Sequence, residues 1–346
     1  MDHSSIFCNS VSGGSSINES DQARPWEFHE TLPFYKKTPI MSLAEIADRL
    51  GVGSVLIKDE SDRFGLSSFK PLGAGYALYK MKDEIANSGK EIITATAGNH
   101  GVGVAFFGAH FGLPTTIYIP EYVTKERETF LQNLGATVVR TEMGYDETVE
   151  LVKQCNPSRY QIVADTAWQG YEEIPQLIRQ GYYTLFYELV EQLLKAHALD
   201  VIVFLQGGVG TFAASGLRYL TSQASKFEKL RFGIVEPEEA SCLFQSAKNK
   251  TNTSVDVGKT KAGCLACGEP NPVEWEYIVD HTHVCIKTSD VDIEYGIEAL
   301  KAKQIKTSYT GAITLGACIS GWGQIKQYID VDERTTIVCI NTEGLN

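Results

Sequence analysis

The chain has 346 residues, of which 43% are apolar and 21% charged, enough material for one large or two ordinary domains. Its 31 basic and 43 acidic residues give a net charge of −12, which argues against nucleic acid as a general partner. No run of about 18 uncharged apolar residues is present, so we expect no membrane span. The first residues lack a basic start followed by an apolar run, and eight cysteines are too few for a disulfide scaffold, so we expect a cytoplasmic protein.

The order of apolar runs predicts an alternation of strands and helices. Residues 1 to about 25 are rich in Ser, Asn, Gly and Asp, and we expect a mobile lead-in there. Strand and helix pairs are then expected at 55–57 and 72–87, 91–94 and 101–110, 115–119 and 124–134, 137–139 and 146–155, and 161–164 and 174–196. Further elements are expected at 200–205, 212–223, 231–235, 238–248, 284–287, 290–303, 310–328 and 335–340, with an irregular stretch at 249–275. This alternation predicts an α/β fold with mostly parallel sheets covered on both faces.

A lysine stands at the start of one helical pattern, in Ser67-Ser68-Phe69-Lys70-Pro71. The partial positive charge of a helix N-terminus and burial both disfavour the ammonium form of a lysine. A neutral amine in such a place can form an imine with a carbonyl cofactor. Judged on this segment alone, a solvated lysine at a helix start is the alternative interpretation.

Two strand-to-helix junctions carry small residues that leave backbone amides accessible. In Thr94-Ala95-Thr96-Ala97-Gly98-Asn99-His100-Gly101 the amides suit a carboxylate, and the Asn side chain can bond a phenolic oxygen. In Gln206-Gly207-Gly208-Val209-Gly210-Thr211 the N–H groups can converge on a phosphate, although the segment is neither a Walker loop nor G-x-G-x-x-G. The last strand ends in Asn341-Thr342-Glu343-Gly344, where a hydroxyl can face a heterocyclic nitrogen. For all three segments an ordinary turn is the alternative.

Together and in this order, these segments resemble the fold-type II pyridoxal-phosphate enzymes, the tryptophan synthase β-like family that includes threonine dehydratases. Longer stretches are most similar to the diaminopropionate ammonia-lyases, namely Lys58-Asp59-Glu60-Ser61, Arg63-Phe64-Gly65-Leu66, Asp165-Thr166-Ala167-Trp168 and Leu265-Ala266-Cys267-Gly268-Glu269-Pro270-Asn271. The resemblance implies two doubly wound parallel-sheet domains with the cofactor between them. It assigns 1–79 and 181–346 to a large cofactor-binding domain and 80–180 to a small substrate-closing domain. It also implies a homodimer.

The resemblance further implies residue roles. Lys70 would hold pyridoxal 5′-phosphate as a Schiff base and, with Asp165, act in catalysis. The cofactor-binding residues would be Phe69, Lys70, Asn99, Gly207, Gly208, Val209, Gly210, Thr211 and Thr342. The substrate-binding residues would be Thr96, Ala97, Gly98, His100, Trp168 and Tyr171, the last two having core packing as an alternative. A neutral hydroxyl at Thr342 would leave the pyridine nitrogen largely unprotonated, which suits elimination. No metal is expected.

One position departs from the ammonia-lyase pattern and leaves three functions open. The ammonia-lyases carry Asp at the position of Ala97. The threonine dehydratases, like this chain, carry Ala there. The preferred hypothesis is pyridoxal-phosphate-dependent β-elimination on a small amino acid, 2,3-diaminopropionate giving pyruvate plus ammonia. The alternatives are a serine/threonine dehydratase-like or β-replacement enzyme working through an aminoacrylate, and a catalytically silent binding protein with this fold.

Two smaller points remain open. The family continues beyond the Thr342-Glu343-Gly344 turn, whereas this sequence ends at Asn346. Cys242 and Cys267 match cysteines of the family, and both a disulfide and two packed thiols are compatible with the sequence. Cys264 and Cys267 form a Cys-x-x-Cys, but no second pair follows at the spacing of a zinc site.

Overall fold

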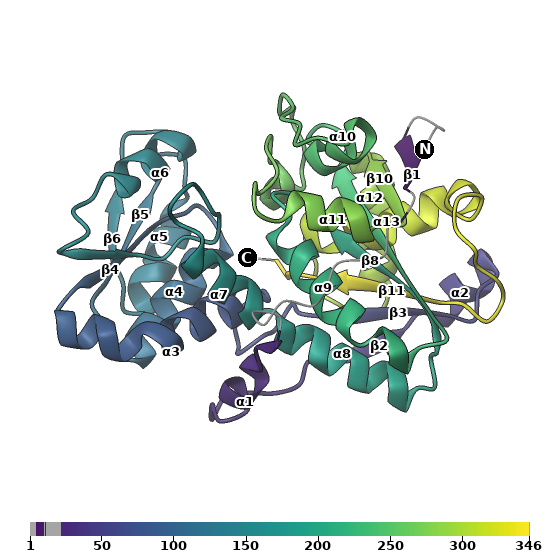
Figure 1. Ribbon diagram of the computed structural model, residues 1–346, viewed down its shortest axis with the longest axis horizontal. Coiled ribbons are helices and arrows are strands. Elements are labelled where there is room, and N and C mark those ends of the chain that lie inside the picture. Colours follow the sequence, from purple (N-terminus) through teal and green to yellow (C-terminus); the bar gives the residue numbers. More distant parts are fainter. Residues whose placement is uncertain (1–4, 10, 12–21, 346) are drawn as a thin grey trace. The chain divides into compact units, whose positions relative to one another are not determined.

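The computed structural model describes residues 5–9, 11 and 22–345. The chain forms two compact units, whose elements are labelled in Figure 1. Unit 1 consists of residues 1–23, 36–68 and 183–346, and unit 2 of residues 24–35 and 69–182. These boundaries differ from the expected ones, because the helix that begins at Lys70 and the segment 24–35 pack within unit 2.

Unit 1 is built on a seven-stranded sheet in the order β1-β10-β9-β8-β11-β3-β2. The five central strands are parallel, and both edge strands are antiparallel. The strands are β1 (Ile6–Cys8), β2 (Ile40–Ser42), β3 (Ser54–Asp59), β8 (Asp200–Gln206), β9 (Lys229–Pro237), β10 (Val284–Thr288) and β11 (Thr336–Asn341). Every residue of β8 is buried, as expected for a continuous apolar run with both faces covered.

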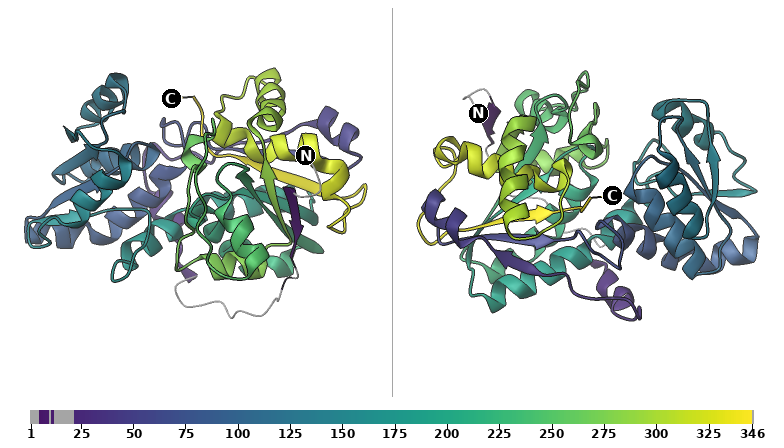
Figure 2. Two further views of the ribbon diagram at one scale, coloured as in Figure 1. Left: turned by 90° about the horizontal axis from the view of Figure 1, so that it is seen from above. Right: turned by 180° about the vertical axis from the view of Figure 1, so that it is seen from behind.

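Helices cover both faces of this sheet (Figure 2). The first face carries α2 (Ala44–Leu50), α12 (Asp290–Ala302) and α13 (Tyr309–Ile325), which share one apolar core with the strands. The other carries α8 (Tyr183–Lys195), α9 (Thr211–Ser222), α10 (Cys242–Asn249) and α11 (Trp275–His281). The predicted α/β architecture with parallel sheets is confirmed.

Unit 2 is built on a smaller, fully parallel sheet in the order β6-β5-β4-β7. Its strands are β4 (Glu91–Ala95), β5 (Thr115–Ile119), β6 (Thr137–Arg140) and β7 (Tyr160–Ile162). Its helices are α1 (Pro25–His29), α3 (Lys70–Ser88), α4 (Asn99–His110), α5 (Lys125–Asn133), α6 (Tyr145–Lys153) and α7 (Glu173–Gly181). Helix α3 packs on α4 and α7. A β-carbon at Gly103 would lie 2.9 Å from Pro71 Cα, so this glycine lets α4 approach the start of α3 closely.

Several expected elements differ from the structure. The single helix expected over 174–196 is two helices, α7 and α8, separated at Tyr182 where the chain passes from unit 2 to unit 1. The lead-in contains β1, which pairs with β10, while residues 1–4, 10 and 12–21 lie outside the described part. Helix α10 begins four residues later than expected, because β9 runs on to Pro237.

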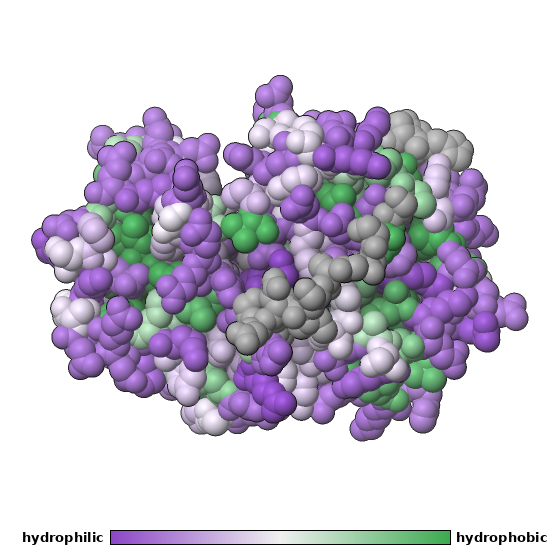
Figure 3. Space-filling model, viewed as in Figure 1, coloured by the Kyte–Doolittle hydropathy of each residue, from purple (hydrophilic) through white to green (hydrophobic). Residues whose placement is uncertain are grey.

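Polar and charged side chains dominate the face in Figure 3, where apolar ones gather only in small groups. Within the described part of the chain, no helix is long and apolar enough to cross a membrane.

Candidate active site

In unit 2, the predicted substrate residues meet at one edge of the sheet. Residues 96–98 follow β4, and Asp165 lies three residues after the end of β7. Because β4 and β7 pair in parallel, both loops leave the same edge. Ligands of parallel sheets bind at this carboxyl edge, so the predicted substrate residues lie at the edge where a ligand is expected.

Lys70 is the first residue of α3, followed by a proline that suits a helix start. Its Nζ lies 2.6 Å from Asp165 Oδ2, and the two side chains are 27% and 22% exposed. The same Nζ lies 5.7 Å from the ring centre of Phe69 and 6.0 Å from that of Tyr182. The structure thus brings both predicted catalytic residues into direct contact within one unit.

The carboxylate of Asp165 is held in its charged form. Burial raises the pKa of Asp165, but the positive charge of Lys70, the electrostatic effect of His100 and the hydrogen bond from Lys70 outweigh burial and keep this pKa well below its usual range. At neutral pH the group is therefore an anion beside the Lys70 amine.

Aromatic side chains fix the loop that carries Asp165. The Tyr171 hydroxyl accepts a hydrogen bond from Ala164 N at 2.9 Å and donates one to Ile162 O at 3.0 Å. Trp168 stacks on Tyr171 with ring centres 3.9 Å apart. Tyr171 thus supports the backbone next to Asp165, a role the sequence left undecided between the pocket and the core.

The start of α4 places two further predicted residues beside this loop. Asn99 Oδ1 accepts a hydrogen bond from Arg127 Nη2 at 3.2 Å. His100 Nε2 lies 2.8 Å from Val163 O, and its Nδ1 lies 3.9 Å from Asp165 Oδ2. Thr96 Oγ1 accepts a bond from Gly98 N, which shapes the turn ahead of the helix. No motif in the sequence points to Arg127 as a site residue.

In unit 1, the glycine loop (residues 207–210) connects the end of β8 to the twelve-residue helix α9. Gly208 and Gly210 adopt φ values of +69° and +99°, in the left-handed region that favours glycine. A β-carbon at Gly207 would lie 2.2 Å from Glu236 Cγ, so no side chain fits there. The loop leaves backbone amides at a helix N-terminus, where an anion such as phosphate is stabilised.

Thr342 follows β11, at the carboxyl edge that also carries the glycine loop. It is 2% exposed, and its Oγ1 has no hydrogen-bond partner. A buried hydroxyl without a partner is costly, so a bound group that completes its hydrogen bonding is favoured. The glycine loop fits a phosphate and this hydroxyl fits a ring nitrogen, which is the donor set that pyridoxal phosphate requires.

Glu236 is a buried acid of unit 1 that the sequence did not single out as a site residue. Burial raises its pKa to about 8, although the backbone N–H groups of Leu243 and Phe244 bond its carboxyl at 3.0 and 2.7 Å. At neutral pH the carboxyl is therefore mostly uncharged, which suits a group packed under an anion-binding loop. The Cys242 thiol lies beside it and also contacts Gly208 O at 3.5 Å; Cys242 and Cys267 are both free thiols.

Comparison with known proteins agrees with this geometry. Residues 31–343 match the family described as "Pyridoxal-phosphate dependent enzyme". The chain belongs to this family. It is 35% identical to the diaminopropionate ammonia-lyase of Escherichia coli strain K12, over 92% of this chain and 87% of that protein. It is 34% identical to the enzyme of the same name from Salmonella typhimurium, with the same coverage. Pyridoxal 5′-phosphate is the cofactor of this family, and the predicted resemblance to ammonia-lyases is confirmed.

Solved structures give the same result. A crystal structure of the Escherichia coli ammonia-lyase with an aminoacrylate–pyridoxal-phosphate azomethine intermediate matches with a TM-score of 0.87 and 32% identity, over 98% of this chain and 93% of that one. A threonine deaminase of Solanum lycopersicum, 19% identical with a TM-score of 0.81, covers 99% of this chain and 93% of its own and shares the fold. The predicted fold-type II architecture is therefore confirmed.

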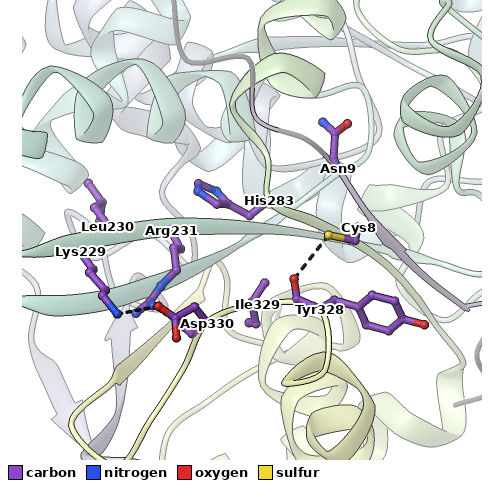
Figure 4. A pocket seen from close by; sticks show the side chains of 9 residues that line it. All are labelled: Cys8, Asn9, Lys229, Leu230, Arg231, His283, Tyr328, Ile329 and Asp330. Carbon is purple, nitrogen blue, oxygen red and sulfur yellow. Dashed lines mark hydrogen bonds and ion pairs between the residues drawn. The ribbon is translucent and has the colours of Figure 1, made fainter.

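A hollow of about 350 Å³ lies elsewhere in unit 1, near the amino ends of β9 and β10 (Figure 4). Two of its basic side chains are paired with acids: Lys229 Nζ lies 2.6 Å from Asp330, and Arg231 contacts Asp200. The glycine loop and Thr342 lie at the opposite, carboxyl edge of the sheet. None of the predicted site residues lines this hollow.

Proposed function

We propose that this protein is a carbon–nitrogen lyase that catalyses β-elimination on 2,3-diaminopropionate, giving pyruvate and ammonia. The observation that carries the proposal is the 2.6 Å contact between Lys70 Nζ and Asp165 Oδ2, next to the loop at residues 96–100. A base and an acid in contact at the carboxyl edge of a parallel sheet can take a proton from a substrate and return it. The two ammonia-lyase relatives named above support the choice of substrate.

We propose that the cofactor-binding residues are Lys70, Phe69, Asn99, the glycine loop, Thr211 and Thr342. When bound, pyridoxal phosphate supplies an electron sink for the α carbon of an amino acid joined to it. Phe69 packs beside the lysine amine. Asn99 Oδ1 accepts a hydrogen bond from Arg127 Nη2, which orients the side-chain amide.

The remaining steps fall to side chains and amides of unit 2. The N–H groups at the start of α4, with Thr96, Ala97 and Gly98, bind the substrate carboxylate, which the helix dipole stabilises. Lys70 takes the proton from the α carbon, and Asp165, kept ionised, accepts a proton from Lys70 or orients the β-ammonium group. Tyr171 and Trp168 hold the Asp165 loop in place.

Ala97 favours a second candidate, a dehydratase-like enzyme that acts on serine or threonine. This residue stands in the turn between β4 and α4, where the ammonia-lyase pattern has Asp, so the turn offers no second carboxylate to an amino leaving group. A hydroxyl leaving group carries no positive charge and needs no such partner.

Incubation of the holoenzyme with both enantiomers of 2,3-diaminopropionate, serine and threonine separates these candidates. We expect pyruvate from diaminopropionate at a kcat/KM at least about tenfold above that for serine, since tenfold corresponds to only about 1.4 kcal/mol of transition-state binding. Absence of keto acid from either enantiomer of diaminopropionate contradicts the proposal. Borohydride reduction followed by peptide mapping should place a pyridoxyl adduct on Lys70.

We also propose that the protein is a cytoplasmic homodimer in which unit 2 contributes a mobile substrate-closing domain. The family resemblance supports the dimer, and the eight free thiols accord with a reducing compartment. Sedimentation of the holoenzyme tests the dimer, and a mass near 38.1 kDa, that of one chain, would contradict it.

A further inference from the structure

The two ring nitrogens of His100 have different surroundings. The side chain is 5% exposed, and Nε2 lies 2.8 Å from the backbone oxygen of Val163. A carbonyl oxygen only accepts hydrogen bonds, so Nε2 carries the hydrogen in the neutral ring and Nδ1 carries a lone pair. Nδ1 is buried and has no hydrogen-bond partner.

This nitrogen lies beside the catalytic acid. His100 Nδ1 is 3.9 Å from Asp165 Oδ2, the same oxygen that lies 2.6 Å from Lys70 Nζ. Leaving a buried acceptor unpaired costs about 1–3 kcal/mol, so a purely structural histidine would be expected to bond both nitrogens. An acceptor poised next to a carboxylate instead can receive a proton whenever that carboxylate becomes a carboxylic acid.

We propose that His100 stores the proton that Asp165 takes up during the elimination, an inference that rests on the proposed function. In this step the Oδ2–H bond of protonated Asp165 breaks and a bond from that hydrogen to Nδ1 forms. The ring becomes an imidazolium, with Nε2–H still bonded to Val163 O and Nδ1–H facing the restored carboxylate. The reverse transfer returns the proton to Asp165, which passes it to the ammonia released from the β carbon. His100 acts through Asp165 and is therefore a positioning residue.

The other titratable groups around Asp165 leave this route open. They are Lys70 at the start of α3, His100 at the start of α4, Tyr171 in the same loop and Tyr182 after α7. Burial raises the pKa of both tyrosines far above neutrality, so they stay protonated. Among these groups, Lys70 and His100 are left as the proton-exchange partners of Asp165.

The decisive variant is His100→Gln, because the glutamine amide nitrogen can still donate to Val163 O while the lone pair at Nδ1 is lost. In D2O, the holoenzyme is incubated with each enantiomer of alanine, which has no leaving group, and loss of the α-proton signal is followed by NMR. We expect exchange at least about tenfold slower in the variant and a changed acid limb of its pH profile. His281→Gln is the control, since that buried ring also bonds a carbonyl, Tyr277 O.

Three results would overturn the inference. The first is exchange within twofold of the wild type in His100→Gln, and the second is no exchange by the wild type at all. The third comes from cofactor-free protein labelled with 15N-histidine, in which we expect the His100 ring to be the Nε2-protonated tautomer; an Nδ1-protonated ring would exclude the transfer. Alanine exchange does not involve diaminopropionate. Slowed exchange in the variant with no diaminopropionate turnover would therefore support the proton transfer between Asp165 and His100 and exclude only the proposed substrate.

Discussion

Two carboxyl groups near the predicted cofactor residues are held in opposite states. Asp165 in unit 2 contacts Lys70 at 2.6 Å and lies 3.9 Å from His100, and its pKa is held well below the usual range. Glu236 in unit 1 is buried among backbone N–H groups and a thiol, and burial raises its pKa to about 8. The contrast shows that a neighbouring cation keeps the half-buried Asp165 charged, whereas full burial without a cation keeps Glu236 uncharged.

The different charge states of Asp165 and Glu236 suit the roles proposed for the two loops. Proton transfer needs an ionised base near neutral pH, which Asp165 provides. An anion-binding loop is better supported by an uncharged neighbour, which Glu236 provides beneath Gly207. The following predictions test this division, from the largest expected effect to the smallest.

Replacing Asp165 with Asn keeps the shape of the side chain and removes its charge. We expect kcat for keto-acid formation to fall by about 10²–10⁴-fold, because proton transfer by a positioned side chain contributes that much. The measurement is steady-state kinetics on the holoenzyme. Asp332→Asn serves as the control, since Asp332 forms an exposed pair with Arg334 that contributes little. Equal rates for both variants would remove Asp165 from catalysis.

Most of the fold was predicted from the sequence because β-branched runs and helix-ending glycines mark its strands and helices clearly. The β-branched run at Thr115–Ile119 coincides with β5, and Gly135 stands just after α5 as expected for a helix end. The separation of α7 from α8 was missed because both halves share one apolar periodicity. Helix α11 was missed as well, and its last residue, His281, is buried.

The site was predicted in part, through local motifs and the family resemblance. These indicated Lys70, Asp165 and the glycine loop, but no local pattern indicates which side chains meet across the fold. The bond from Arg127 to Asn99 and the orphaned nitrogen of His100 depend on the packing of separate elements. The first depends on the parallel pairing of β4 with β5, and the second on the parallel pairing of β4 with β7.

Replacing Glu236 with Gln tests the other half of the comparison through stability. The carboxyl has a pKa of about 8 in the folded chain and about 4.5 when unfolded, so the folded protein binds the extra proton between these values. The stability of the wild type relative to Glu236→Gln should be highest below pH 4.5 and fall as pH rises to 8, by at most about 1.4 kcal/mol per pH unit. Urea unfolding at several pH values measures this. A relative stability independent of pH, as expected for exposed Glu238→Gln, would show that Glu236 titrates normally.

Replacing Tyr171 with Phe tests whether the Asp165 loop needs its support. The loss leaves Ala164 N–H without its partner, and we expect about 1 kcal/mol lower stability and a several-fold lower kcat. Thermal unfolding and kinetics of the holoenzyme measure the two effects. Tyr187→Phe, which removes an exposed bond to Glu191, should leave both unchanged. A Tyr171→Phe protein that behaves like this control would show that Tyr171 contributes through packing and not through its hydrogen bonds.

The glycines of the two loops differ in a way that bears on engineering. A β-carbon added at Gly98 meets nothing within 4 Å, and its backbone lies in the extended region that any residue adopts. At Gly207 the same carbon collides with Glu236, and at Gly210 with Ile278. Saturation mutagenesis aimed at new amino-acid selectivity should therefore concentrate on the turn at Ala97 and Gly98, where folded variants will be recovered, and leave the glycine loop unchanged.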